Sequence, residues 1–315
     1  MCISLAPVQF GKTVTGMHEA EDGSHVVFYQ NVVGAPTAKS ASSTTRGRRR
    51  RSASAAKGAA LPGNWQVASK ARGNALVIPL VTGDFGSVEL LRGTAETPDL
   101  LRDIRRTLLP PQRRSRGSRS FGSDSKGAVV IEQFDIYTIV RAENASAIPN
   151  AVKAVEARKR PPLNQELFDA LESWYGCPFA VACFNTDDDQ GESKPIAFKY
   201  QPLYPDVFMI YTLDGHDGGV PDLNAQVELD HTVFASTWRS KADAGKTVRY
   251  SDDIPAELKP YVPERVVGRS LPAGTTMVNG DILVPIDSVA AGQFEAYRVL
   301  PPNAPARDAV PLAEA

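Results

Sequence analysis

The sequence has few cysteines and no long apolar stretch. Its 315 residues include three cysteines, Cys2, Cys177 and Cys183. Such an odd, sparse set is more typical of a reducing compartment than of a disulfide framework. No stretch approaches the roughly 18 apolar residues of a membrane span, and the N-terminus lacks the basic and apolar regions of a signal peptide. We therefore expect a soluble, intracellular protein, cytoplasmic or carried in a virion, without a membrane partner.

Signatures of the commonest nucleotide and zinc sites are absent. The patterns GxxxxGK[ST], GxGxxG, HExxH, GxSxG and paired CxxC do not occur. These patterns supply the close backbone approach, metal ligands or nucleophile that their chemistries need. The sequence therefore gives no support for nucleotide hydrolysis, dinucleotide redox chemistry or a common zinc site, and it predicts no cofactor. It also has no internal repeat of 20–50 residues, which excludes a solenoid or propeller.

Charge is balanced overall but unevenly distributed. The chain has 35 Lys and Arg against 36 Asp and Glu, a formal net charge of -1. Residues 46–126 carry 17 basic and 6 acidic residues, a charge of +11, so the remainder carries -12. The basic stretches are too poor in apolar residues to fold alone. We predict one globular domain over residues 1–300, with insertions at about 35–72 and 110–127 and a flexible tail at 301–315.

Arginines dominate the two insertions. Guanidinium groups bind phosphate through paired hydrogen bonds without titrating, but Phe121 alone is there to stack on bases. We therefore expect non-specific, salt-dependent contact with nucleic acid or an acidic protein surface. The alternative is a solvated basic loop that neutralises the acidic remainder. The arginines concerned are Arg46, Arg48, Arg49, Arg50, Arg51, Arg113, Arg114, Arg116 and Arg119.

Short apolar segments rich in β-branched and aromatic residues indicate a β-rich fold. They lie between Gly, Pro, Asn or Asp residues, as strands do. Helical patterns are fewer, and the best of them begins at Asn164, a residue that caps helices well. The predicted class is α+β, with antiparallel or mixed sandwich-like sheets and a few peripheral helices. Strands are expected at 26–33, 74–80, 129–140, 179–184, 195–200, 207–213, 232–238, 281–286 and 293–300, and helices at 98–109, 150–158 and 164–175.

Cys2 is the first candidate for chemistry. Removal of Met1 would leave a residue that carries both a thiol and an α-amine at the N-terminus. The ordinary pKa of such an amine is roughly 7.7–8.0, so the amine can act as the base that activates its own nucleophile. This is the arrangement of N-terminal nucleophile hydrolases. The alternative is a small apolar residue buried on a first strand.

Two of the four histidines lie among carboxylates. His216 belongs to the segment Asp214-Gly215-His216-Asp217-Gly218-Gly219, and Asp230 directly precedes His231. A carboxylate beside an imidazole fixes its tautomer, as a general base or a metal ligand requires. One interpretation is a site with Cys2 as nucleophile, His216 or His231 as base and Asp230 as orienting group. A metal site at His216, Asp214 and His231 and a plain polar turn are the alternatives.

Several short segments resemble one family in the same order along the chain. They are residues 1–4 (MCIS), 26–31 (VVFYQN), 74–79 (NALVIP), 194–198 (KPIAF) and 230–234 (DHTVF), with the turn at His216 before the last. Together they resemble an uncharacterised family of soluble proteins from bacteria, protists and large DNA viruses, with an MCxS start, LPVP and PIAY strands and a late WDH segment. The resemblance covers about residues 1–240. The chain departs from the pattern at Leu229, where the family has Trp, and at the single His216, where it has a pair.

Two functions are compatible with these residues. The first is a cysteine-dependent hydrolase or amidase of the N-terminal nucleophile type, in which Cys2 attacks a carbonyl and the Asp230–His231 pair assists, with His216 as a further candidate. The second is a non-catalytic structural or assembly protein, homo-oligomeric or virion-associated, whose arginine-rich insertions contact nucleic acid or partner subunits. The sequence alone leaves both open.

Overall fold

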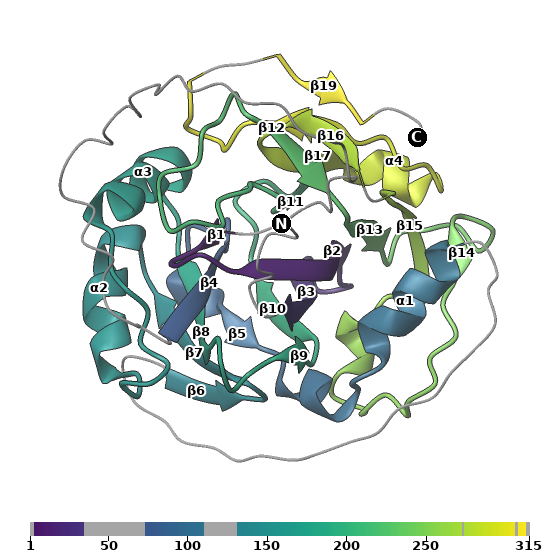
Figure 1. The fold of residues 1–315 in the computed structure, drawn as a ribbon. Coiled ribbons are helices and arrows are strands. Elements are labelled where there is room, and N and C mark those ends of the chain that lie inside the picture. Colours follow the sequence, from purple (N-terminus) through teal and green to yellow (C-terminus); the bar gives the residue numbers. More distant parts are fainter. Residues whose placement is uncertain (1–2, 35–72, 110–130, 273, 306–307, 313–315) are drawn as a thin grey trace, which may run out of the picture.

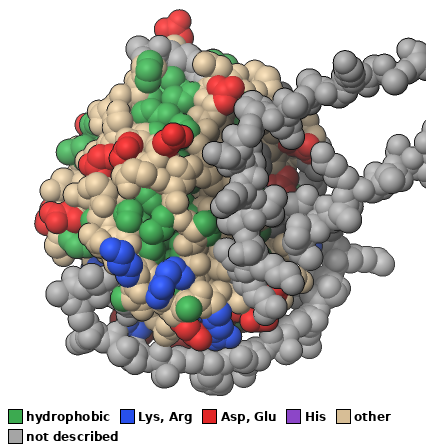
Figure 2. Space-filling model, turned by 60° about the vertical axis from the view of Figure 1, so that its left-hand side comes forward, with side chains coloured by type: hydrophobic (Ala, Val, Ile, Leu, Met, Phe, Trp, Pro, Cys, Tyr) green, Lys and Arg blue, Asp and Glu red, His purple; other side chains and the backbone are tan. Residues whose placement is uncertain are grey.

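A computed structural model describes residues 3–34, 73–109, 131–272, 274–305 and 308–312. Cys2 and all nine arginines proposed to bind polyanions lie outside these ranges, so the predictions that concern them remain sequence predictions. The described residues include 20 of the 35 Lys and Arg and 34 of the 36 Asp and Glu, a formal charge of -14. Acidic side chains are scattered between apolar patches over the face shown in Figure 2.

An eight-stranded mixed sheet forms the centre of the fold (Figure 1). Its longest strands, β2 (Gln9–Glu19) and β3 (His25–Gly34), form an antiparallel hairpin, and β13 (Thr232–Thr237) runs parallel to β2. The pairing order is β14-β15-β13-β2-β3-β10-β5, and β9 also pairs with β3. The remaining members are β5 (Glu89–Leu90), β9 (Gly191–Glu192), β10 (Ile196–Tyr200), β14 (Lys246–Thr247) and β15 (Arg265–Ser270).

Three smaller antiparallel sheets surround this one. A five-stranded sheet has the order β1-β4-β8-β7-β6, with the short N-terminal strand at one edge. Its strands are β1 (Ile3–Ser4), β4 (Gly73–Pro79), β6 (Ile131–Phe134), β7 (Tyr137–Ala142) and β8 (Phe179–Asn185). The other two sheets are β11 (Val207–Ile210), β17 (Asp281–Pro285), β18 (Tyr297–Val299) and β19 (Val310–Pro311), and β12 (Gln226–Leu229) with β16 (Thr275–Val278).

The helices lie at the periphery, with α2 and α3 on one side of Figure 1 and α1 on the other. Asn164 begins α3 as the sequence predicts, because its side chain accepts a hydrogen bond from the N–H of Glu166 (3.1 Å). Gly176 ends this helix in the left-handed conformation that glycine adopts readily. The α-helices are α1 (Leu100–Leu108), α2 (Ile148–Ala151), α3 (Gln165–Tyr175) and α4 (Ile286–Ala290). The 3-10 helices are η1 (Phe85–Ser87), η2 (Arg92–Glu96), η3 (Ala145–Ala147), η4 (Val152–Ala154) and η5 (Lys259–Tyr261).

Each face of the central sheet buries a separate apolar cluster. Val27 and Tyr29 of β3 face the larger one, which lies toward the five-stranded sheet. Val26 and Phe28 alternate with them and face the smaller one beneath α1. Burial of both faces explains why β3 has an almost continuous apolar sequence. The predicted β-rich α+β class, with sandwich-like sheets and few helices, is confirmed.

Two predicted elements differ from the structure. The single strand predicted at 129–140 contains a turn, because Asp135 has a positive φ of 55° and separates β6 from β7. The helix predicted at 150–158 begins and ends earlier, since α2 and η4 together reach only Ala154. Other differences are omissions, because no strand was predicted where β2, β12, β15 and β16 form.

Candidate functional site

The N-terminal strand lies between β4 and the turn that carries His216. Ile3 forms a parallel bridge with Gly215, and Ser4 donates its N–H to the carbonyl of Gly215 (2.8 Å). On its other edge, Ile3 and Ser4 pair with Val77 and Leu76 of β4. Consecutive Cα atoms are about 3.8 Å apart, so Cys2 is attached to a residue held beside this turn. The described N-terminal strand is thereby fixed on both of its edges, by β4 and by the turn that carries His216.

Asp214 and His216 form a dyad within the turn. The Nε2 atom of His216 lies 3.4 Å from Oδ1 of Asp214, and both side chains are about one-fifth exposed. Phe10 packs edge-on against the imidazole, with ring centroids 5.4 Å apart. Burial raises the pKa of Asp214 above its ordinary value, although the positive charges of the N-terminus and Arg298 act in the opposite direction. The imidazole therefore has both a carboxylate partner and access to solvent.

Glycines allow the turn to fold over the N-terminal segment. Gly218 has a φ of +80°, and a Cβ there would lie 2.6 Å from the carbonyl oxygen of Leu5. A Cβ on Gly215 would lie 2.8 Å from Pro221. Val8 closes the contact by donating its N–H to the carbonyl of His216 (3.2 Å). Gly218 thus allows the turn to approach residues 5–8 closely, and Gly215 allows the loop to pack against its own Pro221.

Asp230 and His231 form a second dyad, but the histidine is deeply buried. Nδ1 of His231 lies 3.4 Å from Oδ1 of Asp230, and the His231 side chain is 0% exposed. Asp230 also accepts the N–H of Lys12 (3.2 Å), where β2 has a bulge and Lys12 a positive φ of 54°. The carboxylate is therefore partly committed to holding the bulge. An imidazole with no solvent-accessible surface is poorly placed to take a proton from a substrate-facing group.

The metal interpretation finds no support in the described part of the chain. A metal site needs several His, Cys, Asp or Glu side chains that converge on one point. Among the described residues, no group of three or more such side chains is arranged to hold a metal ion.

The other two cysteines are in the core, as their apolar surroundings predict. Cys177 and Cys183 are 2% and 0% exposed. Burial raises the pKa of each thiol to about 12, which leaves almost no thiolate at neutral pH. Neither is suited to be a nucleophile.

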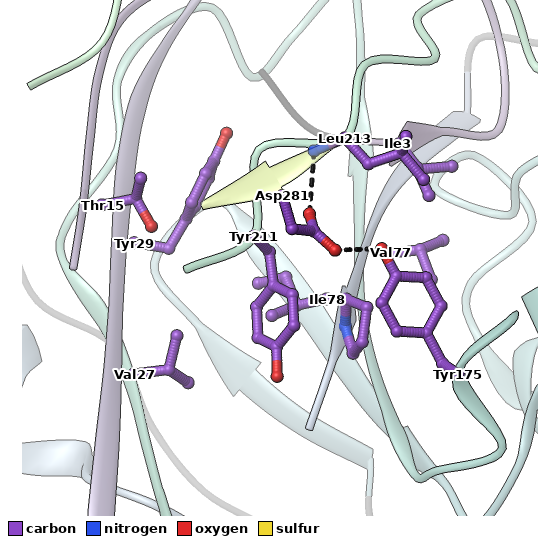
Figure 3. Close-up of a pocket in the computed structure, with 11 residues that line it drawn as sticks. Ile3, Thr15, Val27, Tyr29, Val77, Ile78, Tyr175, Tyr211, Leu213 and Asp281 are labelled. Atoms are coloured by element: carbon purple, nitrogen blue, oxygen red, sulfur yellow. Dashed lines mark hydrogen bonds between the residues drawn. The ribbon is translucent and has the colours of Figure 1, made fainter. Parts of the chain in front are cut away.

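A buried acid beneath the N-terminal strand escaped the sequence analysis. Asp281 accepts hydrogen bonds from the N–H groups of Thr212 and Leu213 (3.0 and 3.1 Å) and from the hydroxyl of Tyr175 (2.7 Å; Figure 3). Arg298, which is also fully buried, bonds to both oxygens of Thr212. The apolar strand pattern at 281–286 gave no sign of this network, because a lone Asp at a strand start usually faces solvent.

A small cavity adjoins Asp281. Its walls include Ile3, Thr15, Tyr29 and Leu213, so the N-terminal strand covers it (Figure 3). The space left for the centre of a water molecule is about 10 Å³, which is enough for one water at most. This cavity is therefore not a substrate pocket.

Comparison with known proteins identifies no family. No family model matches the chain, and no curated protein sequence matches it. Among solved structures, the crystal structure of baculovirus P35 is similar over 91% of this chain and 92% of that chain, with 6% sequence identity and a TM-score of 0.41. A likeness of this degree carries no inference about function. None of the described helices combines the length and apolar character that spanning a membrane demands.

Proposed function

We propose that this protein is a cysteine-dependent hydrolase or amidase of the N-terminal nucleophile type, with Cys2 as nucleophile, His216 in place of the α-amine as general base, and Asp214 as the group that orients it. The observation that supports the proposal is the bridge between Ile3 and Gly215, which holds the N-terminal segment beside the Asp214–His216 dyad. Asp214 takes the place that the sequence analysis gave to Asp230, because His231, the partner of Asp230, is fully buried.

In the proposed reaction, His216 takes up or releases one proton at each step. Because the Asp214 carboxylate lies beside Nε2, the proton of neutral His216 stays on that nitrogen, and the lone pair is on Nδ1. Nδ1 takes the thiol proton of Cys2, and the sulfur attacks the carbonyl carbon of the substrate. When the tetrahedral intermediate collapses, the C–N bond breaks and the proton returns to the leaving amine. Water then attacks the thioester, with His216 again as base, and releases the acid and the thiol.

Selective alkylation tests this proposal. Intact mass of the native protein first establishes that Met1 is removed. Iodoacetamide at neutral pH should then modify Cys2 before Cys177 and Cys183, whose thiols are buried. The His216→Ala variant should slow the modification of Cys2 at least about tenfold, because the base is lost. The matched control is His231→Ala, which removes an imidazole that does not take part.

Two results would overturn the proposal. Retention of Met1 on the native protein would leave no N-terminal cysteine. Equal alkylation of Cys2 in the wild type and the His216→Ala variant would show that this imidazole does not act on the thiol.

The assembly alternative rests on the arginine-rich insertions. All nine of its arginines lie outside the described residues, so it stays a prediction from sequence. Its test is the dependence of nucleic-acid affinity on salt concentration.

A further inference from the structure

The structure assigns Asn279 a positioning role for the Asp214–His216 dyad. Asn279 follows β16 in the turn that leads to β17, more than 60 residues along the chain from the dyad, and it is 1% exposed. This inference rests on the proposed function, since it concerns the orientation of the proposed base.

The side-chain amide of Asn279 holds the backbone of Asp214 from both sides. Its Oδ1 accepts the N–H of Asp214 (2.8 Å), and its Nδ2 donates to the carbonyl oxygen of Asp214 (2.9 Å). The same Oδ1 accepts the N–H of Gly280 (2.9 Å), and Nδ2 also donates to the carbonyl of Asp222 (3.1 Å). All four hydrogen-bonding positions of the amide are therefore used.

This pattern fixes which end of the amide is oxygen. Reversal would place Nδ2 against two N–H groups and Oδ1 against two carbonyl oxygens, and both contacts would be repulsive. Only an asparagine at this position satisfies all four backbone groups. Aspartate would keep the two accepted bonds but would place a carboxylate oxygen against the carbonyls of Asp214 and Asp222.

Clamping the N–H and the carbonyl of one residue restricts both of its backbone angles. For Asp214, these angles set the direction of the Cα–Cβ bond, from which the carboxylate reaches to within 3.4 Å of Nε2 of His216. Asn279 also joins Asp214 to Asp222, so it closes the base of the loop that carries His216. Loss of the clamp should release the carboxylate from the imidazole while leaving both residues present.

The test compares the Asn279→Ala and Asn185→Ala variants of the full chain. Asn185 is the matched control, because it is also 1% exposed and its amide also holds a turn, by accepting the N–H groups of Asp187 and Asp188 and donating to Arg158. Nitrogen-15 NMR of the His216 ring reports which nitrogen carries the proton. We expect Asn279→Ala to shift the ring nitrogen signals of His216, because Nε2 loses its contact with the Asp214 carboxylate, and Asn185→Ala to leave these signals unchanged.

Unchanged His216 ring signals in Asn279→Ala, or equal changes in both variants, would overturn the positioning role. If Asn279→Ala does not fold, Asn279→Asp keeps two of the four hydrogen bonds and is measured instead. The rate of Cys2 alkylation distinguishes the two hypotheses. Suppose the His216 ring signals change in Asn279→Ala, but Cys2 is alkylated at the same rate in the wild type and in His216→Ala. This result would contradict the proposed hydrolase and leave the positioning role of Asn279 in place.

Discussion

Two buried histidines at the end of the β2–β3 hairpin couple stability to pH. Burial lowers the pKa of both His18 and His25 from 6.5 to about 4. His18 hydrogen bonds with Oγ of Ser236 (3.2 Å), and the ring of His25 packs against Phe208 with centroids 5.0 Å apart. Both imidazoles are therefore neutral in the folded protein at neutral pH and gain a proton on unfolding in mild acid.

The direction of this pH dependence follows from the number of protons that the folded and unfolded states bind. Between pH 6.5 and pH 4 the unfolded chain binds more protons at these positions than the folded protein, so the free energy of unfolding falls as pH falls. Each histidine contributes about 3 kcal/mol to this fall if its full shift is realised. Asp214 and Asp281 act in the opposite direction, because their pKa values are raised. Urea denaturation between pH 7 and pH 4.5 should show a clear loss of stability.

The His18→Gln/His25→Gln double variant isolates this contribution. Whatever its stability at pH 7, it should lose less stability on acidification than the wild type, because glutamine does not titrate. Identical pH dependence in the two proteins would show that other groups control the response.

At the scale of elements, the central strands depend on close backbone contact. Gly16 of β2 and Gly268 of β15 are the register partners of Phe234 on either side of β13. A Cβ at Gly16 would overlap both the ring and the carbonyl of Phe234. The aromatic ring thus occupies the space that a side chain on β2 would need.

A pair of glycine variants in the same strand tests this packing. We expect Gly16→Ala to reduce the free energy of unfolding by about 2 kcal/mol or more, as overpacking does. Gly11→Ala should change it by less than about 1 kcal/mol, since its Cβ would have no atom closer than Oδ2 of Asp230, 3.9 Å away. Urea denaturation measures both, and equal effects would contradict the packing argument.

The elements also show where sequence patterns succeed. The sequence predicts strands such as β3 and β8 because short runs of apolar, β-branched and aromatic residues between turn-forming residues favour strands. The longest strand, β2, was not predicted, because Gly11, Lys12 and Gly16 interrupt its apolar pattern. Its bulge and its pairing with β13 depend on residues more than 200 positions away, which a local pattern does not contain.

In the candidate site, too, the local contacts could be predicted from the sequence and the long-range contacts could not. Asp214 and His216 are close in sequence, so their pairing could be foreseen from the motif. The clamp by Asn279 and the burial of His231 follow from long-range contacts and could not. The sequence therefore identified candidate residues but favoured the Asp230–His231 pair, whose histidine is fully buried in the structure.

Charge is distributed very unevenly along the whole chain. The described residues have a formal charge of -14, while the chain as a whole has -1. The arginines of the two insertions account for most of the difference. Such a chain is expected to associate with polyanions in a manner that depends strongly on salt.

Nucleic-acid affinity across a salt series tests the assembly alternative. Affinity should fall steeply between about 50 and 200 mM salt, by 10³-fold or more if six phosphates are contacted. Replacing Arg48, Arg49, Arg50 and Arg51 by alanine should weaken binding and flatten the slope. No binding at low salt would remove nucleic acid as a partner.

The central claim is that the N-terminal cysteine and the Asp214–His216 dyad form one site. Its most direct measurement is the distance between Sγ of Cys2 and Nδ1 of His216 in a crystal structure of the protein purified with Met1 removed. The account predicts hydrogen-bond contact, or contact through one water, because a base must reach the proton it takes. A separation of more than about 10 Å, with no rearrangement able to close it, would contradict the account.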